Sequence, residues 1–307
     1  MGTAHSRCRV PGPGHVRNTV ERSGLVRLSV VIPVLNEEET IGGCLESLAG
    51  LERPVDECIV VDNNCTDRTL EIVRSYADRL PVRVVTEPRP GLIWARERGF
   101  EEARGDLLGR IDADTRVDPE WSREVIEFMD AHPEIAGVSG PTYPYDVPLG
   151  DRLERSLRKR AADPRARRGR ERPNLYGANM AVRKSAWQAA RDLQVRATNV
   201  LEDVDLYLAL KKKGFTAWYL PTMLAAQSYR RAKATPVSNL GYTMAGPRTY
   251  RLHGEYAMVV RLWLMIPMWL VTGWLIWAVL LPYDLETRTW GRRHIRNGLR
   301  GRVSPVH

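Results

Sequence analysis

Residues 28–34 read Leu-Ser-Val-Val-Ile-Pro-Val, and no other stretch constrains the architecture as strongly. The run is β-branched and almost continuously apolar, which is typical of a strand buried on both faces of a parallel sheet. Similar runs follow at residues 58–61, 82–86 and 107–111. Between them, apolar residues recur at helical spacing over residues 41–51, 70–80 and 94–103. Strands that alternate with helices predict βαβ units with right-handed crossovers, and therefore an open α/β sheet.

The pattern is less regular after the fourth strand. Asp118 offers an N-cap, with Pro119 at the first helical position, for a helix that follows directly. Residues 176–183 predict a loop followed by a helix. The acidic run at residues 202–205 then opens a further helix, which ends near Gly214.

The amino-acid composition limits the classes of protein and the kinds of partner that fit this chain. Of the 307 residues, 43% are hydrophobic and 27% are charged, which excludes a wholly disordered or fibrous chain. The net charge of +9 favours an anionic partner, such as anionic lipid or a phosphorylated substrate. No nucleic-acid-binding module accompanies the charge, so nucleic acid is not an expected partner. The four cysteines form no CxxC pair and no histidine lies at zinc-finger spacing from them, so neither disulfides nor structural zinc are expected.

Polar residues directly after the strands are the candidate ligands, because loops converge beyond the carboxyl ends of such a sheet. Asp112-Ala-Asp114 suits a divalent cation, Mg²⁺ or Mn²⁺, that bridges a diphosphate. Asp62 can accept hydrogen bonds from a nucleobase or ribose beside a helix N-terminus. Plainer alternatives stay open: a solvated turn for the aspartate pair, and local helix capping for residues 62–67.

The exit from the first strand is a third candidate. Pro33 lacks a backbone donor inside a buried strand, which predicts an irregular exit where backbone meets ligand. Glu37 follows in the same loop. The alternative for residues 37–39 is an acidic first helical turn favoured by the helix dipole, and the same alternative applies to Glu202 and Asp203.

Residues 152–172 carry ten basic and three acidic side chains. Three interpretations fit this charge: a solvated flexible insertion, a patch that binds anionic lipid headgroups, or a clamp for a lipid-phosphate acceptor.

Residues 262–281 contain no charged side chain, and as a helix they reach about 30 Å, the thickness of a bilayer core. A single crossing from the cytosol would export the arginine-rich tail that follows, against the positive-inside tendency. Pro267 can bend the segment so that both ends stay on one side, so a re-entrant or interfacial helix is an open alternative. A buried helix that packs on the α/β domain is another.

Six motifs resemble those of family 2 glycosyltransferases, in the same order, over residues 28–229. They are VVIPVLNE, VVDNNCTDRT, GLIWARERGFEEARG, DAD, GANMAVRK and EDVDL, at residues 30–37, 60–69, 91–105, 112–114, 177–184 and 202–206. The resemblance implies a GT-A fold, an open mixed and mostly parallel sheet flanked by helices. A C-terminal hydrophobic, membrane-associated helical segment would follow it.

The resemblance also implies inverting, metal-dependent transfer of a sugar from a nucleotide-diphosphate sugar. Asp203 would be the catalytic base and Asp114 the ligand of Mg²⁺ or Mn²⁺. The nucleotide sugar would be bound by Pro33, Glu37, Asp62 and Asp112. The acceptor or diphosphate side would include Glu202, Asn179, Gln227 and Arg230. Polymer-forming members carry Gln-x-x-Arg-Trp, whereas residues 227–231 end in Arg, which indicates a non-processive enzyme.

We therefore expect a flexible basic leader over residues 1–27 and a glycosyltransferase domain over residues 28–235 with a basic insertion at 152–172. A membrane-associated region with a basic tail would occupy residues 236–307. The acceptor would be lipid-linked or a cell-envelope glycan, at the cytoplasmic face of the cell membrane. The alternatives are a non-catalytic membrane-associated scaffold that binds sugar nucleotides and a sugar nucleotidyltransferase. The second should carry a glycine-rich basic loop after the first strand, which residues 34–37 lack.

Overall fold

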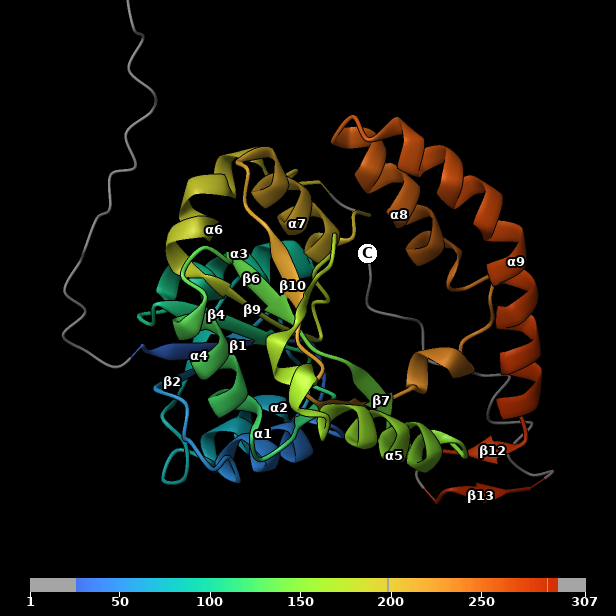
Figure 1. The fold of residues 1–307 in the computed structure, drawn as a ribbon. Helices are drawn as coiled ribbons and strands as arrows, with labels where there is room; N and C mark the ends of the chain where they lie inside the picture. Colours follow the sequence, from blue (N-terminus) through green and yellow to red (C-terminus); the bar gives the residue numbers. More distant parts are fainter. Residues whose placement is uncertain (1–25, 198, 286, 292–307) are drawn as a thin grey trace, which may run out of the picture.

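The computed structural model describes residues 26–197, 199–285 and 287–291. Nearly all of the predicted basic leader, and the tail arginines from Arg292 onward, lie outside these residues. The described chain folds into a layered α/β body, with one long helix along its side (Figure 1).

An eight-stranded sheet crosses the body in the order β3-β2-β1-β4-β9-β6-β10-β8. The strands are β1 (Leu28–Val34), β2 (Glu57–Asp62), β3 (Val82–Thr86), β4 (Leu107–Ile111), β6 (Gly137–Ser139), β8 (Arg170–Glu171), β9 (Asn179–Arg183) and β10 (Ala217–Tyr219). The first four in spatial order are parallel, and β9 runs antiparallel to both of its neighbours. β10 is parallel to β6 and antiparallel to β8. The predicted mixed, mostly parallel sheet is confirmed.

Helices cover both faces of this sheet (Figure 1). One layer contains α1 (Ile41–Ala49), α2 (Thr69–Arg74) and α4 (Trp121–Ala131); the other contains α3 (Leu92–Glu102), α6 (Lys184–Ala190) and α7 (Glu202–Lys212). Alternate residues of β1 serve the two layers: Val30 packs with α1 and α4, and Val31 packs with α3. A Cβ at Gly99 would lie 2.3 Å from Val31, so a glycine is needed for α3 to approach the sheet this closely.

A smaller sheet lies at the edge where the candidate residues were predicted. It has the order β5-β11-β7, formed by Thr115–Val117, Ala225–Gln227 and Thr142–Pro144. β5 follows Asp114 directly, and its Thr115 pairs with Gln227 at the end of β11. This pairing brings the segment around residue 227 beside the Asp-Ala-Asp turn.

Three local predictions are wrong. Residues 179–183 form a strand, not a helix, because they pair with β4 on one side and β6 on the other. α2 ends at Arg74, and the apolar residues as far as Leu80 lie in turns. Asp118 does not cap α4, which begins after Glu120; its carboxylate instead accepts hydrogen bonds from Tyr143 and Arg158.

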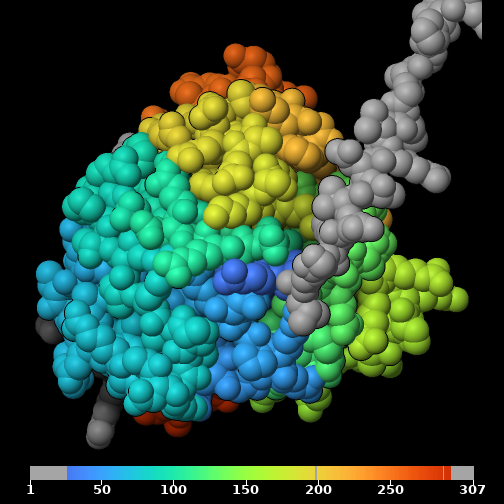
Figure 2. Space-filling view, turned by 90° about the vertical axis from the view of Figure 1, so that its left-hand side faces the viewer, coloured from blue at the N-terminus to red at the C-terminus, as the bar shows by residue number. Residues whose placement is uncertain are grey.

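The basic segment is more regular than its composition suggests. α5 (Gly150–Ala161) is a helix, and a 3₁₀ turn (Pro164–Arg168) follows it before β8. Leu157 is the buried anchor of α5, while most of its basic side chains are exposed. Figure 2 shows this region projecting from the side of the body.

The C-terminal part forms two helices that pack against each other, α8 (Leu240–Leu252) and α9 (Tyr256–Leu280). α9 contains most of the predicted apolar run and begins six residues before it. Of the helices in the described ranges, it alone is long and apolar enough to cross a membrane. A third, two-stranded sheet, β12 (Tyr283–Asp284) with β13 (Thr289–Trp290), closes the described chain.

Candidate active site

The loops after β1 and β2 are joined to each other by side-chain hydrogen bonds. Asn36 adopts a positive φ of 56°, which asparagine tolerates, and its Oδ1 accepts the backbone N–H of Thr66 at 2.8 Å. The N–H of Glu37 donates to Thr69 Oγ1 at 2.8 Å. The carboxylate of Glu37 is therefore fixed in place at the sheet edge.

Asp62 ends β2 in register with Val34 of β1. Its Oδ1 accepts the N–H of Cys65 at 2.9 Å, which closes the polar loop, and its second oxygen makes no hydrogen bond within the described chain. The neighbouring Asn63 ties in the loop after β3, because its amide donates to the carbonyls of Glu87 and Arg89 at 2.7 Å each. The loops after three adjacent strands thus form one rigid edge.

Asp114 lies in the turn after β4, and its side chain is almost wholly buried. Arg230 bridges it to the first loop: Nε lies 3.4 Å from Asp114 Oδ2, and Nη2 lies 2.7 Å from Glu37. Burial and the nearby carboxylate of Asp112 raise the pKa of Asp114 to about 7, although Arg230 opposes this. Three predicted site residues that are far apart in sequence therefore meet here.

Few side chains near Asp114 could act as metal ligands. Among the described residues, no group of three or more His, Cys, Asp and Glu side chains is arranged to hold a metal ion. However, Asp114 Oδ1 is buried and has no hydrogen-bond partner. One such carboxylate oxygen fits a hard divalent cation when phosphate oxygens of a ligand supply most of the remaining coordination.

Asp112, two residues before Asp114, takes part in a further set of hydrogen bonds and in an ion pair. Gln227 Nε2 donates to Asp112 Oδ2 at 3.2 Å, and the Tyr176 hydroxyl donates to Gln227 Oε1 at 2.8 Å. The other oxygen of Asp112 lies 2.7 Å from Arg110 Nη2. We refer to Glu37, Asp62, Asp112 and Asp114 as the strand-end carboxylates.

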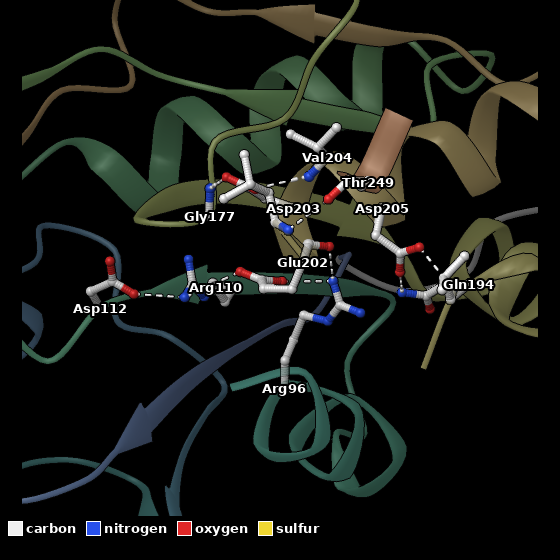
Figure 3. A network of polar contacts seen from close by, with 12 residues as sticks. Arg96, Arg110, Asp112, Gly177, Gln194, Glu202, Asp203, Val204, Asp205 and Thr249 are labelled. Atoms are coloured by element: carbon white, nitrogen blue, oxygen red, sulfur yellow. Dashed lines mark hydrogen bonds and ion pairs between the residues drawn. The ribbon is translucent and has the colours of Figure 1, made fainter. Parts of the chain in front are cut away.

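Glu202 and Asp203, the helix-start carboxylates, open α7 on the other side of Arg110. Figure 3 shows Arg110 between Asp112 and Glu202, with Arg96 reaching Glu202 from α3. Arg110 Nη2 lies 3.3 Å from Glu202, and Arg96 Nη1 lies 2.7 Å from it. All three side chains are buried, and burial raises the pKa of Glu202. Glu202 is thus neutralised by two arginines.

Asp203 lies next to this group and is only partly buried. Its Oδ2 accepts the N–H of Gly177 at 2.9 Å, and its Oδ1 accepts the N–H of Val204 at 2.8 Å. These bonds fix the orientation of the Asp203 carboxylate. A Cβ at residue 177 would lie 1.8 Å from Arg110 Nη1, so only glycine fits there.

α8 holds the start of α7 from the outside. Thr249 Oγ1 accepts the N–H of Leu201 at 2.9 Å. His253 Nε2 lies 2.8 Å from Asp205 Oδ1, and both side chains are fully buried. Asp205 also accepts the N–H of Val195 at 2.7 Å. The helix-start carboxylates are therefore positioned from α3, β4 and α8 together.

Two predicted residues do not join the cleft. Asn179 is fully buried in β9, where its Oδ1 accepts the indole N–H of Trp121 at 2.7 Å and its amide donates to two carbonyls. Pro33 is buried inside β1, paired with Val61, and the strand continues regularly to Val34. Both side chains support the sheet.

Sequence reasoning missed Arg96, Arg110, Tyr176, Thr249 and His253 as members of the site. Arg110 did carry a signal, since an arginine inside an otherwise apolar run implies a buried counter-charge. Arg96 is followed by Glu97 and Arg98 and carried no such signal. The two α8 residues carried none.

Comparison with known proteins gives a consistent result. Residues 29–189 match the family model described as glycosyl transferase family 2, and residues 110–285 match that of glycosyl transferase family group 2. The lipopolysaccharide core biosynthesis glycosyltransferase LpsC of Rhizobium meliloti is 35% identical over 149 residues, 48% of this chain and 53% of the relative. The dodecaprenyl-phosphate galacturonate synthase of Rhizobium johnstonii is 34% identical over 110 residues, 34% of this chain and 32% of the relative. The chain thus spans about half or less of the length of these relatives.

Two solved structures resemble the fold. S. aureus TarS 1–349 in complex with UDP-GlcNAc superposes with a TM-score of 0.52 at 20% identity, over 66% of this chain and 58% of that one. The mannosyltransferase PcManGT from Pyrobaculum calidifontis, in complex with GDP-Man and Mn²⁺, gives a TM-score of 0.52 at 19% identity, over 84% and 75% of the two chains. At these identities the likeness shows the fold alone.

Proposed function

The chain belongs to glycosyl transferase family 2, and from this premise we propose that it is an inverting, metal-dependent, non-processive glycosyltransferase. It takes a sugar from a nucleotide-diphosphate sugar and gives it to a lipid-linked or cell-envelope acceptor. The observation that carries the proposal is the network of polar contacts in which Arg230 joins Glu37 to Asp114, and Arg110 joins Asp112 to Glu202 beside Asp203.

On the donor side, Asp62 accepts hydrogen bonds from the nucleoside through its unused carboxylate oxygen, while Glu37 and Arg230 line the same edge. Asp112 contacts the ribose or the sugar. Asp114 would hold the divalent cation through Oδ1, which is buried and has no hydrogen-bond partner. When bound, Mg²⁺ or Mn²⁺ neutralises the charge that develops on the leaving diphosphate.

Asp203 acts as the base. An acceptor hydroxyl attacks the anomeric carbon from the face opposite the diphosphate; the new carbon–oxygen bond forms as the bond to the phosphate oxygen breaks. The proton of the hydroxyl passes to the Asp203 carboxylate. The N–H groups of Gly177 and Val204 orient that carboxylate toward the cleft. Glu202 is already paired with two arginines, so it positions Asp203 and does not compete for the proton.

The proposed acceptor and location rest on two relatives and on the C-terminal region. Two matched relatives are, by name, a lipopolysaccharide core biosynthesis glycosyltransferase and a dodecaprenyl-phosphate galacturonate synthase. The apolar α9 and the basic α5 support a membrane-borne acceptor reached from the cytoplasmic face. We keep residues 28–235 as the glycosyltransferase domain, with the following region as its membrane-associated part.

A thermal-shift screen tests the donor. The full chain is heated with a panel of uridine, guanosine and thymidine diphosphate sugars, with Mn²⁺, with Mg²⁺ or with EDTA. A ligand that binds only the folded state raises Tm by mass action, so we expect one nucleotide class to raise Tm with metal and not with EDTA. No shift with any nucleotide sugar would overturn the proposal.

An activity assay distinguishes a glycosyltransferase from a nucleotidyltransferase and from a non-catalytic scaffold. With the donor identified, product release is followed on a lipid phosphate and on soluble glycans. Release of nucleoside diphosphate with transfer of the sugar supports the proposal. In a parallel reaction with a nucleoside triphosphate and a sugar 1-phosphate, release of pyrophosphate with formation of the nucleotide sugar would identify a nucleotidyltransferase. Donor binding without any transfer would identify a scaffold.

A further inference from the structure

α9 has two different faces. The side chains of Ile266 and Leu280 are buried, and Gly273 packs near Pro236, so one face rests on the protein. The opposite face is an apolar stripe at helical spacing, with side chains between 60% and 77% exposed: Val260, Leu264, Val271, Leu275 and Val279. We call these five residues the outer stripe. A stripe of this length is unstable in water unless something covers it.

Both ends of α9 are attached to the same α/β body. At its start, Glu255 pairs with Lys211 of α7 at 2.6 Å. After its end, Tyr283 is buried and Arg288 donates to the carbonyl of Tyr145, in the loop that leads to α5. Figure 1 shows α9 running down one side of the molecule, from beside α7 to the sheet of β12 and β13.

This attachment is incompatible with a simple crossing. A helix of 25 residues is about 37 Å long, longer than the hydrocarbon core of a bilayer. If α9 stood along the membrane normal, its two ends would lie on opposite sides, and the charged body that contacts both ends would be immersed in lipid. A charged surface of that size cannot be placed in hydrocarbon.

The positions of the tryptophans also favour a helix that lies in the membrane plane over one that crosses the membrane. In a spanning helix, tryptophan gathers near the two ends, at the two interfaces. Here Trp263, Trp269 and Trp274 are spread along the helix, and all three are exposed. A helix that lies in the headgroup region has its whole length at that depth, which suits this distribution.

The charge beside α9 indicates the kind of membrane. α5 begins five residues after Tyr145, so the attachment of Arg288 brings it close to the end of α9. Its exposed cations are Arg152, Arg155, Arg158, Lys159 and Arg160, of which Arg158 is paired with Asp118 and Glu154. Basic side chains beside an apolar surface stabilise binding to anionic headgroups.

We propose that α9 lies in the plane of an anionic membrane, with the outer stripe among the acyl chains and both of its ends on the side of the α/β body. The described part of the chain then enters the membrane from one side without crossing it. This deepens the proposed function, on which it rests for the membrane-borne acceptor. A second copy of the chain that covers the outer stripe, and a true crossing, are the competing outcomes.

Sidedness is the decisive test. Single cysteines replace Arg251, before α9, and Thr287, after it, in a full chain with Cys8→Ser and Cys65→Ser. Cys44 and Cys58 stay, because both are buried and burial raises the pKa of Cys58 to about 12. A membrane-impermeant maleimide is added to right-side-out and inverted membrane vesicles. We expect both sites to be labelled in the same vesicle orientation; labelling in opposite orientations would show a crossing and overturn the proposal.

Vesicle flotation tests the stripe itself. The full chain should float with vesicles of phosphatidylcholine and phosphatidylglycerol, and much less with phosphatidylcholine alone. L264E with L275E should lower binding by about tenfold or more, because both charges must enter the acyl region. Thr272→Glu, at the margin of the stripe, is the matched control and should lower it less. Flotation of the double variant equal to that of the parent, or a stable parent dimer that ignores vesicles, would overturn the proposal.

The two proposals fail separately. The metal-dependent thermal shift with nucleotide sugar is measured on the parent, on L264E with L275E and on Thr272→Glu, and it should be unchanged because all three positions lie on α9. If the parent floats but shows no shift with any donor, the membrane proposal stands and the proposed function fails.

Discussion

The strand-end carboxylates and the helix-start carboxylates are held in place in opposite ways. Asp62 and Glu37 are fixed by hydrogen bonds inside the loops that carry them and to the adjoining loop. Glu202 is fixed by Arg96, 106 residues away in sequence, and the residue before it by Thr249, 48 residues away. Contacts within and between neighbouring strand-end loops therefore hold the backbone of the first group, with Arg230 added from 193 residues beyond Glu37, whereas the second group is held mainly by contacts between distant elements. Substitutions that act on one group should leave the other intact.

Asp203→Asn should have the largest effect, because it should remove the function of the helix-start carboxylates and leave that of the strand-end carboxylates intact. Turnover with a hydroxyl acceptor should fall by about 10²–10⁴-fold, the usual contribution of a general base, while donor affinity stays within a few-fold. Steady-state rates and calorimetric titration of the donor measure the two effects. Asp78→Asn makes the same change at an exposed position and should alter neither. Full turnover of Asp203→Asn on a hydroxyl acceptor would exclude it as the base.

Arg110→Met should destabilise the protein, because Arg110 lies between Asp112 of the strand-end carboxylates and Glu202 of the helix-start carboxylates. Removing one partner of a buried ion pair costs about 3–5 kcal/mol, because the remaining carboxylates lose their counter-charge. Urea denaturation measures the change in the free energy of unfolding. Adding Glu202→Gln should recover part of the loss, since the two residues are coupled. The control is Arg68→Met, whose ion pair with Glu38 is exposed and contributes little. Strict additivity of the two substitutions at residues 110 and 202 would contradict the coupling.

Asp114→Asn should act on the strand-end group alone. The amide oxygen is a weaker metal ligand, so the metal-dependent part of nucleotide binding should be lost, a decrease of roughly a hundredfold. Calorimetry of the nucleoside diphosphate with Mn²⁺ measures it. The parent protein in EDTA is the matched comparison, and the variant with Mn²⁺ should behave like it. A variant that keeps a large Mn²⁺ effect would place the cation elsewhere.

His253→Ala should act on the helix-start group alone and more mildly. Loss of the bond to Asp205 should loosen α7 and lower kcat by about tenfold with little change in donor affinity. His253→Gln, whose amide can still donate to Asp205, should restore most of the rate. Leu252→Ala, at an exposed neighbour, is the control. Equal losses in kcat and donor affinity, without rescue, would indicate a merely structural role.

The raised pKa of Asp114 should also make the stability of the metal-free protein depend on pH. Burial and the carboxylate of Asp112 raise the pKa of Asp114 to about 7, from about 3.9 in an unfolded chain. Between these values the folded state holds the extra proton, so the free energy of unfolding should fall as pH rises from about 4 to about 7. Urea unfolding in EDTA across this range should show a flatter dependence for Asp114→Asn than for the parent. Identical slopes would contradict the raised pKa.

Much of the fold follows from local pattern. The strands at residues 28–34, 82–86 and 107–111 have the predicted bounds because each is a short, mainly apolar run that alternates with a helical pattern along the chain. Residues 179–183 were misassigned because a five-residue strand between two others carries no periodicity that distinguishes it from a helix.

The candidate site residues also divide into those that the local sequence predicted and those that it did not. Glu37, Asp62, Asp112 and Asp114 were found because each follows a strand whose end is visible in the sequence. Asn179 was assigned to the cleft because a motif names a residue without its orientation; in the strand its side chain points into the core. The support from Thr249 and His253 was invisible, since it depends on how α8 docks after the rest has folded.

The close approach of Gly177 to Arg110 makes the two positions a linked pair in any attempt to redesign this cleft. A side chain at residue 177 would expel the guanidinium, and loss of the guanidinium would leave two carboxylates repelling each other. Libraries that vary one position at a time would score both as intolerant. Only simultaneous replacement, with a neutral residue at 202, opens a route to a cleft of different polarity, and the room released beside Asp203 would then be available for a bulkier acceptor.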